Sequence, residues 1–286
     1  MVYLQSPIEF LTKIESVPAS KRKDILLSYI DSVHCESNIS VRSQEFLYKK
    51  EERSNIIITV PGSSDKKYVI GAHYDIWPKS GGVNDNGAAI FILLQIVKDI
   101  LDLSNNPITL DFVFFDLEEK RQIGANEYLK HENIENIIAM INLDMCGIGD
   151  YVIFNDTSNN PPALSTKLEQ ICGETKINYK KLPLMPHGDD IAFRNHDIQA
   201  ISVAIVPLVV IPVVERLAYI SSTKGISWKK ITDSVKFMVD MIKGGVPVLE
   251  TMHTERDTVD TISIKSMETI YSLVKKFIIK LCRNNC

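Results

Sequence analysis

Residues 108–131 read ITLDFVFFDLEEKRQIGANEYLKH. Positions 108–116 form an apolar run rich in aromatic and β-branched residues, which is typical of a buried strand. Positions 120–131 continue with a pattern that favours a helix. Parallel sheets with helices on both faces are built from buried strands that lead directly into helices, so this stretch favours an α/β fold.

The same alternation extends along most of the chain. The helix that starts at Asn86 is apolar almost all round, which predicts that it is buried. We therefore expect one domain over residues 1–286, with three layers (α/β/α) around a central, twisted, mixed but mostly parallel sheet. The further strand candidates are 55–60, 68–73, 137–144, 151–155 and 199–206, and the helix candidates are 20–33, 86–101, 162–173, 189–195 and a C-terminal segment around 267–281.

The composition is that of an ordinary globular protein. Hydrophobic residues make up 45% and charged residues 24% of the 286 positions, and the net charge is −4. Lysine and arginine are scattered and form no stripe, so we expect no nucleic-acid partner. No uncharged apolar stretch reaches the length of about 18 residues that a membrane span needs, so we expect no membrane segment. The sequence leaves the oligomeric state open.

The cysteines indicate the compartment. The 5 cysteines are odd in number and include no CxxC pair, so they cannot all pair within one chain. The first residues show no basic segment followed by a long apolar run, which is the pattern of a signal peptide. We therefore expect a reducing, cytoplasmic compartment, whereas a chain from which a signal peptide had been removed would be secreted.

Acidic and histidine side chains gather where predicted strands end. In open α/β sheets, ligands bind beyond the carboxyl ends of the strands. Groups that are far apart in the sequence can therefore meet in one crevice. The candidates are His73 and Asp75 in GAHYDIW, Asp85 in GGVNDNGAA, Glu118 and Glu119 in FFDLEEK, Asp144 in INLDMCG, and His253 in MHTERDTVD.

Each of these signals has an ordinary structural explanation when it stands alone. Adjacent acids are common in the first turn of a helix, and an Asp after a strand often caps the next helix. Together, however, Asp85, Glu119 and Asp144 would repel one another at the end of an apolar sheet unless a cation lay between them. These carboxylates and a bridging hydroxide would balance the charge of two Zn²⁺ ions. His73 and His253 would add neutral nitrogen donors.

At these stretches the sequence resembles the co-catalytic zinc aminopeptidases. This family includes bacterial leucyl aminopeptidase and aminopeptidase Y, and it is related to glutaminyl cyclase and glutamate carboxypeptidase. The resemblance covers about residues 55–206 and 250–262 and implies an exopeptidase that acts on peptides with a free amino terminus. The matching stretches are GAHYDIW, VNDNGAA, FVFFDLEEKRQIGANEYL, INLDMCG, GDDIAF and HTERDTVD.

The resemblance also implies a role for each site residue. Asp75 would orient His73, Glu118 would be the general base, and the peptide bond that follows Asp85 would be cis. Because Glu118 and Glu119 follow a strand, we expect extended backbone that points their side chains in different directions. Two Zn²⁺ ions per chain are implied, with His73 and Asp144 on one ion, Glu119 and His253 on the other, and Asp85 on both.

Two other functions fit parts of this pattern. A glutaminyl-peptide cyclase with a single zinc uses similar residues, but its relatives usually have Ser after the bridging-position Asp, where this chain has Asn86. A non-catalytic binding domain on the same fold would have lost metal ligands, whereas all of the ligand and base positions are filled here. An aminopeptidase is therefore the leading hypothesis, and the cyclase is the alternative.

The chain departs from the family around the substrate pocket. Where many relatives have Ser-Asp-His, it has Gly188, Asp189 and Asp190. The candidate substrate-binding residues are Asp189, Asp190, Trp77 and His187. Trp77 and His187 could instead be ordinary parts of their loops.

The segment 207–250 is longer than the corresponding loop of compact relatives. It begins with PLVVIPVV, where two prolines disfavour a central strand. It continues into a helix candidate around 231–242 and ends in KGGVPVLET, which has the composition of a turn. An ordinary additional helix is one interpretation. Our hypothesis is that this insertion walls the metal cleft, limits access to short peptides and contributes to a subunit contact.

Overall fold

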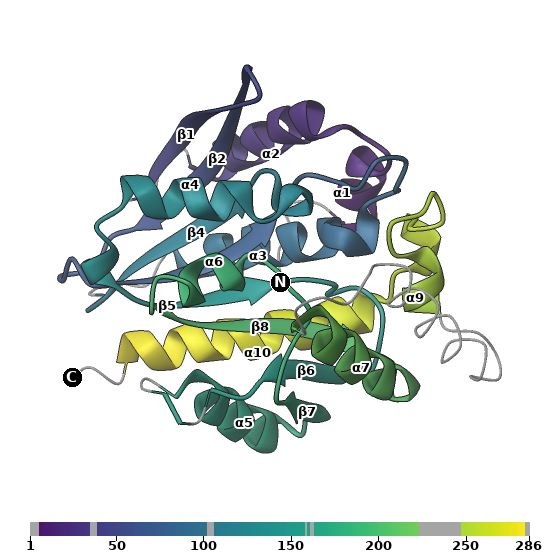
Figure 1. Cartoon of the computed structure of the whole chain (residues 1–286). Coiled ribbons are helices and arrows are strands. Elements are labelled where there is room, and N and C mark those ends of the chain that lie inside the picture. Colours follow the sequence, from purple (N-terminus) through teal and green to yellow (C-terminus); the bar gives the residue numbers. More distant parts are fainter. Residues whose placement is uncertain are drawn as a thin grey trace.

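The computed structural model describes residues 6–34, 39–101, 106–157, 159–160, 163–222 and 247–283. Within them, an 8-stranded sheet has the strand order β1-β2-β4-β3-β5-β8-β6-β7 (Figure 1). The strands are β1 (Ser40–Tyr48), β2 (Glu51–Val60), β3 (Lys67–His73), β4 (Thr109–Phe115), β5 (Ile137–Leu143), β6 (Tyr151–Asn155), β7 (Tyr179–Leu182) and β8 (Gln199–Val206).

The centre of the sheet is parallel. β3 lies between β4 and β5 and runs parallel to both, and β5 and β8 are also parallel. β1 and β2 form an antiparallel pair that joins β4, whereas β6 pairs antiparallel with β8 and parallel with β7. The predicted mixed, mostly parallel sheet is confirmed, with the antiparallel pairs toward its edges.

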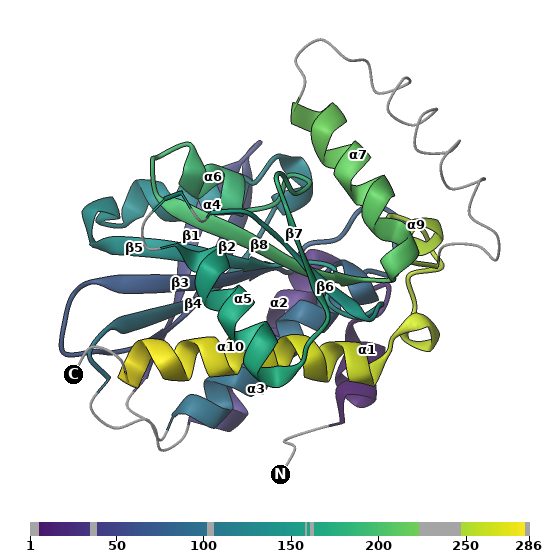
Figure 2. The ribbon, with the colours of Figure 1, turned by 90° about the horizontal axis from the view of Figure 1, so that it is seen from below.

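Helices cover both faces of the sheet, as the predicted three-layer architecture requires (Figure 2). α1, α2, α3, α5 and α10 pack on one face, and α4 and α6 pack on the other. The helices are α1 (Pro7–Ile14), α2 (Ala19–His34), α3 (Ala88–Ile100), α4 (Ile123–His131), α5 (Leu164–Thr175), α6 (Asp190–Arg194), α7 (Ile211–Ser222), α9 (Pro247–Thr251) and α10 (Ile264–Arg283), with short helical turns η1 (Val83–Gly87), η2 (Glu118–Lys120), η3 (Ile134–Asn136), η4 (Leu208–Val210) and η5 (Val259–Thr261).

Strand β4 shows why the central strands are apolar throughout. Leu110, Phe112 and Phe114 belong to the core on one face of the sheet, whereas Val113 and Phe115 belong to the core on the other. Successive side chains of a strand point to opposite faces, and here helices cover both faces. A continuous apolar run is therefore the expected sequence of such a strand.

The elements expected from the sequence do not include the edge strands or the first helix. β1 has the sequence SVRSQEFLY with mostly exposed side chains, and β7 is the short polar strand YKKL. Edge strands carry polar side chains because one side of them faces water, so their apolar signal is weak. The helix α1 does carry a start signal that the prediction overlooked, because Ser6 and Glu9 form a capping box around a proline at the first helical position.

The segment 207–250 is helical where the structure describes it. η4 leads directly into α7, with Pro212 in its first turn, where the missing N–H breaks no helical hydrogen bond. The predicted helix around 231–242 lies outside the described residues, so the role of the segment at the metal cleft stays a prediction. In the part of the chain that is described, no helix combines the length and the apolar character needed to cross a bilayer.

The aromatic side chains of β4 should contribute strongly to stability. Phe112 is 0% exposed, so Phe112→Ala should lower the free energy of unfolding by about 3–5 kcal/mol in chemical denaturation. Leu47→Ala is the control because Leu47 is 74% exposed, and it should change this free energy by less than about 0.5 kcal/mol. Similar effects of the two substitutions would contradict the packing described above.

Candidate metal centre

Four candidate site residues stand at neighbouring strand ends. His73 is the last residue of β3, Asp144 follows β5 directly, and Glu118 and Glu119 lie just beyond β4. Because β3 lies between β4 and β5 and all three strands are parallel, their carboxyl ends meet at one edge of the sheet. The structure thus brings these residues together as the sequence predicts.

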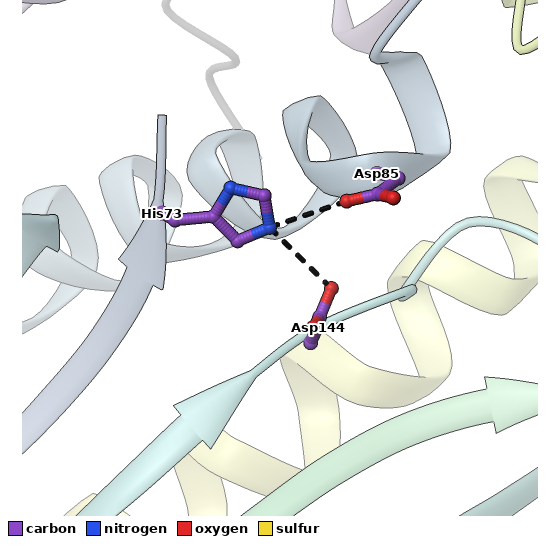
Figure 3. A group of neighbouring side chains, drawn as sticks. All are labelled: His73, Asp85 and Asp144. Atoms are coloured by element: carbon purple, nitrogen blue, oxygen red, sulfur yellow. Dashed lines mark ion pairs between the residues drawn. The ribbon is translucent and has the colours of Figure 1, made fainter. Parts of the chain in front are cut away.

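Asp85 and His253 reach the same edge on connecting segments. Asp85 lies in η1, between β3 and α3, and His253 follows α9. The Nε2 atom of His73 lies 3.2 Å from Asp85 Oδ1 and 3.8 Å from Asp144 Oδ1 (Figure 3). The Nε2 atom of His253 lies 3.3 Å from Asp85 Oδ2 and 3.4 Å from Glu119 Oε2. The two oxygens of Asp85 therefore face two different histidines.

These side chains form two sets of possible metal ligands that share one residue. Within each set the donor atoms lie within 4.8 Å of one another. Imidazole nitrogens with carboxylate oxygens are a donor set that zinc prefers, and the buried atoms Asp144 Oδ1 and Glu119 Oε1 form no hydrogen bond with the described residues. The residues therefore fit two divalent ions. The sets are His73, Asp85 and Asp144, and Asp85, Glu119 and His253.

The segment around Asp85 is fixed by hydrogen bonds to its backbone and side chains. The peptide bond between Asp85 and Asn86 is cis, which confirms what the resemblance implied. Asn86 Nδ2 donates to the carbonyl oxygen of Leu143, at the end of β5, at 2.8 Å. The two carboxylate oxygens of Asp257 accept from the backbone N–H groups of Asn84 and Asp85, at 2.7 and 3.1 Å. Asp85 is thereby held against the ends of other ligand segments.

Asp75 contacts both His73 and the segment that carries the glutamates. His73 Nδ1 lies 3.2 Å from the backbone carbonyl oxygen of Asp75 and 3.3 Å from its Oδ1 atom, so the Nε2 atom of that ring faces Asp85. The backbone N–H groups of Glu118 and Glu119 donate to the Asp75 carboxylate at 3.0 and 3.3 Å. The backbone carbonyl group and the carboxylate of Asp75 together orient three neighbouring residues.

The extended backbone that we expected at Glu118 and Glu119 is wrong. Leu117 has a left-handed conformation with φ of 58°, and a tight helical turn starts at Glu118. The turn still separates the two side chains. Glu118 Oε1 accepts a hydrogen bond from Gln122 Nε2 at 2.9 Å, whereas Glu119 Oε2 faces His253.

Burial shifts the pKa values of the carboxylates at the site. Burial raises the pKa of Glu118 to about 7 and that of Glu119 to about 8, and it also raises the pKa of Asp144. Burial alone would raise the pKa of Asp85 as well, but hydrogen bonds from His253 and His73 outweigh it and hold that pKa below its usual range. A bound cation would stabilise the ionised form of every one of these carboxylates.

Asp189 and Asp190, the two aspartates among the candidate substrate-binding residues, have different surroundings. Asp189 is 0% exposed, and neither of its carboxylate oxygens has a hydrogen-bond partner among the described residues. Burial and the nearby Glu118 raise the pKa of Asp189 well above its usual value. Asp190 is also buried, but it forms an ion pair with Arg194 at 2.8 Å within α6. Asp189 therefore keeps both oxygens for a ligand, whereas the Oδ2 atom of Asp190 is paired with Arg194.

Trp77 and His187 lie in more exposed positions. The Trp77 ring stacks on the His253 ring, with centroids 4.5 Å apart and an angle of 10° between the planes. Lys120 Nζ lies 5.5 Å from the centroid of the Trp77 ring. His187 is exposed. Trp77 thus supports a candidate metal ligand, and a contact of Trp77 or His187 with substrate stays a prediction.

Sequence reasoning did not single out Asp257, which contacts the Asp85 segment. It lies in the stretch HTERDTVD, which begins at His253, and it is 0% exposed. The only signal in the sequence is its presence in that matching stretch. Its hydrogen bonds go to backbone N–H groups, so no pattern of neighbouring side chains reveals them.

The sequence is similar to those of known peptidases. The model of peptidase family M28 matches residues 55–278. A probable leucine aminopeptidase of Trichophyton verrucosum is 24% identical over 213 residues, which cover 68% of this chain and 56% of that protein. The chain spans about half or less of the length of the curated relatives that it matches.

Solved structures share the fold. A zinc aminopeptidase from Bacillus subtilis aligns with a TM-score of 0.61 at 17% identity, over 82% of this chain and 51% of that chain. A glutaminyl cyclase from Porphyromonas gingivalis aligns with a TM-score of 0.67 at 16% identity, over 96% of this chain and 97% of that chain. The family match spans most of the sequence and includes every candidate metal ligand, and the chain therefore belongs to peptidase family M28.

Proposed function

We propose that this chain is a zinc-dependent aminopeptidase, which removes the N-terminal residue from peptides. The observation that carries the proposal is the position of Asp85, whose two carboxylate oxygens face His73 and His253. One carboxylate between two imidazoles is what a pair of metal ions with a shared ligand requires. The names of two similar proteins, a probable leucine aminopeptidase and a zinc aminopeptidase, support the same activity.

In this proposal each chain binds two Zn²⁺ ions. His73 and Asp144 would hold one ion, Glu119 and His253 would hold the other, and Asp85 would be a ligand of both. When bound, such ions would supply Lewis-acid chemistry that polarises the scissile carbonyl group and lowers the pKa of a water molecule.

Glu118 is the proposed general base. It is 8% exposed, and the hydrogen bond from Gln122 Nε2 fixes its carboxylate beside the ligand sets. Burial raises the pKa of Glu118 to about 7, and a cation bound nearby would lower it again, so the ionised carboxylate would be the proton acceptor. Glu118 takes the proton of the attacking water and returns it to the leaving amine. Asp75 holds the backbone of Glu118 in place for this transfer.

The free amino terminus of the substrate is proposed to bind near Asp189. A buried carboxylate without hydrogen-bond partners is costly, and an ammonium group would supply both charge and donors. Asp189 meets this description, whereas Asp190 is already paired with Arg194. The amino end of a peptide would then lie at the floor of the site, beside Glu118.

We propose a cytoplasmic location for this activity. Cys146, Cys172 and Cys282 are free thiols, and the first two are buried. Free thiols are typical of proteins in reducing compartments.

The metal content tests the ligand assignment. After mild loading with zinc and removal of the excess, elemental analysis should find close to two ions per chain, because two ligand sets share Asp85. A content that stays at one ion would instead favour the single-zinc glutaminyl cyclase.

Substitutions of the adjacent glutamates distinguish the general base, Glu118, from the metal ligand, Glu119. Glu118→Gln removes the proton acceptor and should lower kcat about 10²–10⁴-fold while both ions stay bound. Glu119→Gln removes a metal ligand, so the variant should lose one ion. Kinetics and metal analysis of both variants make the test, and each serves as the control for the other. Substantial activity of Glu118→Gln would show that the base is assigned incorrectly.

The N-terminal specificity can be tested with a pair of peptides that differ only in acetylation. The free peptide should be cleaved and the acetylated one should not, because acetylation removes the ammonium group that Asp189 would bind. Asp189→Asn should raise KM for the free peptide. Liquid chromatography of the products measures both results, and equal hydrolysis of the two peptides would point to an endopeptidase or a carboxypeptidase.

A further inference from the structure

Arg22 is a buried arginine whose hydrogen bonds reach the loop before Asp85. It lies on α2 and is 1% exposed. Its Nη2 atom donates to the carbonyl oxygens of Gly81 and Gly82, at 3.0 and 2.9 Å, and also to that of Ile14 at 2.9 Å. Arg22 precedes residues 55–278, the part of the chain that matches the family. Arg22 therefore contacts the Asp85 loop from outside the region that the family model matches.

The loop is held from its other end by a group of opposite charge. Asp257 accepts from the backbone N–H groups of Asn84 and Asp85. The cation thus binds the carbonyl groups at the start of the segment, and the anion binds the amide groups at its end. Charge-assisted hydrogen bonds of this kind are shorter and stronger than neutral ones. Together they set the position of Asp85 along the edge of the sheet.

The fit around the two glycines is close. Gly82 has φ of 67°, and a Cβ atom added there would lie 2.4 Å from Arg22 Nη2. A Cβ atom added at Gly81 would lie 1.9 Å from the carbonyl oxygen of Asp257. A larger residue would push the backbone away from Arg22 or from Asp257. Glycine at positions 81 and 82 therefore allows the close contacts of the loop with Arg22 and Asp257.

The corner between α1 and α2 also contacts the segment that follows His253. The backbone N–H of Ser16 donates to the carbonyl oxygen of Gly81 at 2.8 Å. The Oε2 atom of Glu15 accepts from the backbone N–H of Val259 at 3.0 Å. One corner of the N-terminal helices thus contacts both the Asp85 loop and the segment that carries a ligand of the second set.

We propose that Arg22 is a positioning residue of the metal centre, which keeps the Asp85 loop where both carboxylate oxygens face the two histidines. This inference rests on the proposed function, because it takes Asp85 to be the shared metal ligand. The hydrogen bonds of Arg22 go to backbone carbonyl groups and not to the side chain of any candidate metal ligand. An arginine that only stabilised the fold would leave metal affinity unchanged in the variants that still fold.

The test compares Arg22→Met and Arg22→Lys with Lys21→Met, an exposed position on the same helix. Each full-length variant is titrated with Co²⁺, and the visible spectrum, the metal stoichiometry, the thermal midpoint, kcat and KM are recorded.

Arg22→Met should bind Co²⁺ about 10–100-fold more weakly, as is typical when a residue that orients a metal ligand is lost. Its Co²⁺ spectrum should change, and kcat should fall more than KM changes. Arg22→Lys keeps the charge without the planar fork and should be intermediate. Lys21→Met should match the unmodified chain.

Where Arg22→Met fails to fold, Arg22→Lys and Glu15→Ala carry the test with the same measurements. Unmodified Co²⁺ affinity and spectrum in the folded Arg22 variants would overturn the inference while leaving the proposed function intact. Failure of the unmodified chain to bind two ions would overturn both. The two failures are therefore distinguishable in one set of titrations.

Discussion

The structure depends on keeping several carboxylates together out of water. Asp85, Glu118, Glu119 and Asp144 converge where three parallel strands end, at the edge of an apolar sheet. Carboxylates in such a place lose hydration and repel one another, so burial raises the pKa of Glu118 to about 7 and that of Glu119 to about 8. The cations that we propose to bind here would offset this repulsion only in the folded chain. Metal binding and folding should therefore be linked.

The apolar sheet behind the site gives these side chains fixed positions. β3, β4 and β5 are buried on both faces, so their ends cannot shift without disturbing two layers of helices. Hydrogen bonds then fix the residues that follow each strand. Asp75 binds the turn at Glu118 and Glu119, and Asn86 ties the Asp85 segment to the end of β5. The polar groups at the edge therefore depend on the packing of the core.

The sequence predicts the parts of the molecule whose signal is carried by the side chains themselves. The central strands are predicted because burial on both faces demands apolar runs, and His73 and Asp144 are predicted because they end such runs. The edge strands β1 and β7 are missed because their polar faces resemble loops. The turn at Leu117 is missed because a left-handed leucine has no sequence signal, unlike glycine.

The contacts that position Asp85 are harder to predict for a physical reason. Asp257 and Arg22 bind backbone N–H and carbonyl groups, which every residue possesses, so the partners leave no mark in the sequence. Each charge nevertheless needs its partner, since a buried arginine or aspartate without hydrogen bonds would be strongly unfavourable. Because Arg22 and Asp257 are both buried, the backbone groups around Asp85 supply the hydrogen bonds that stabilise their charges. The position of Asp85 in the candidate metal centre therefore depends on contacts with residues that a ligand motif does not contain.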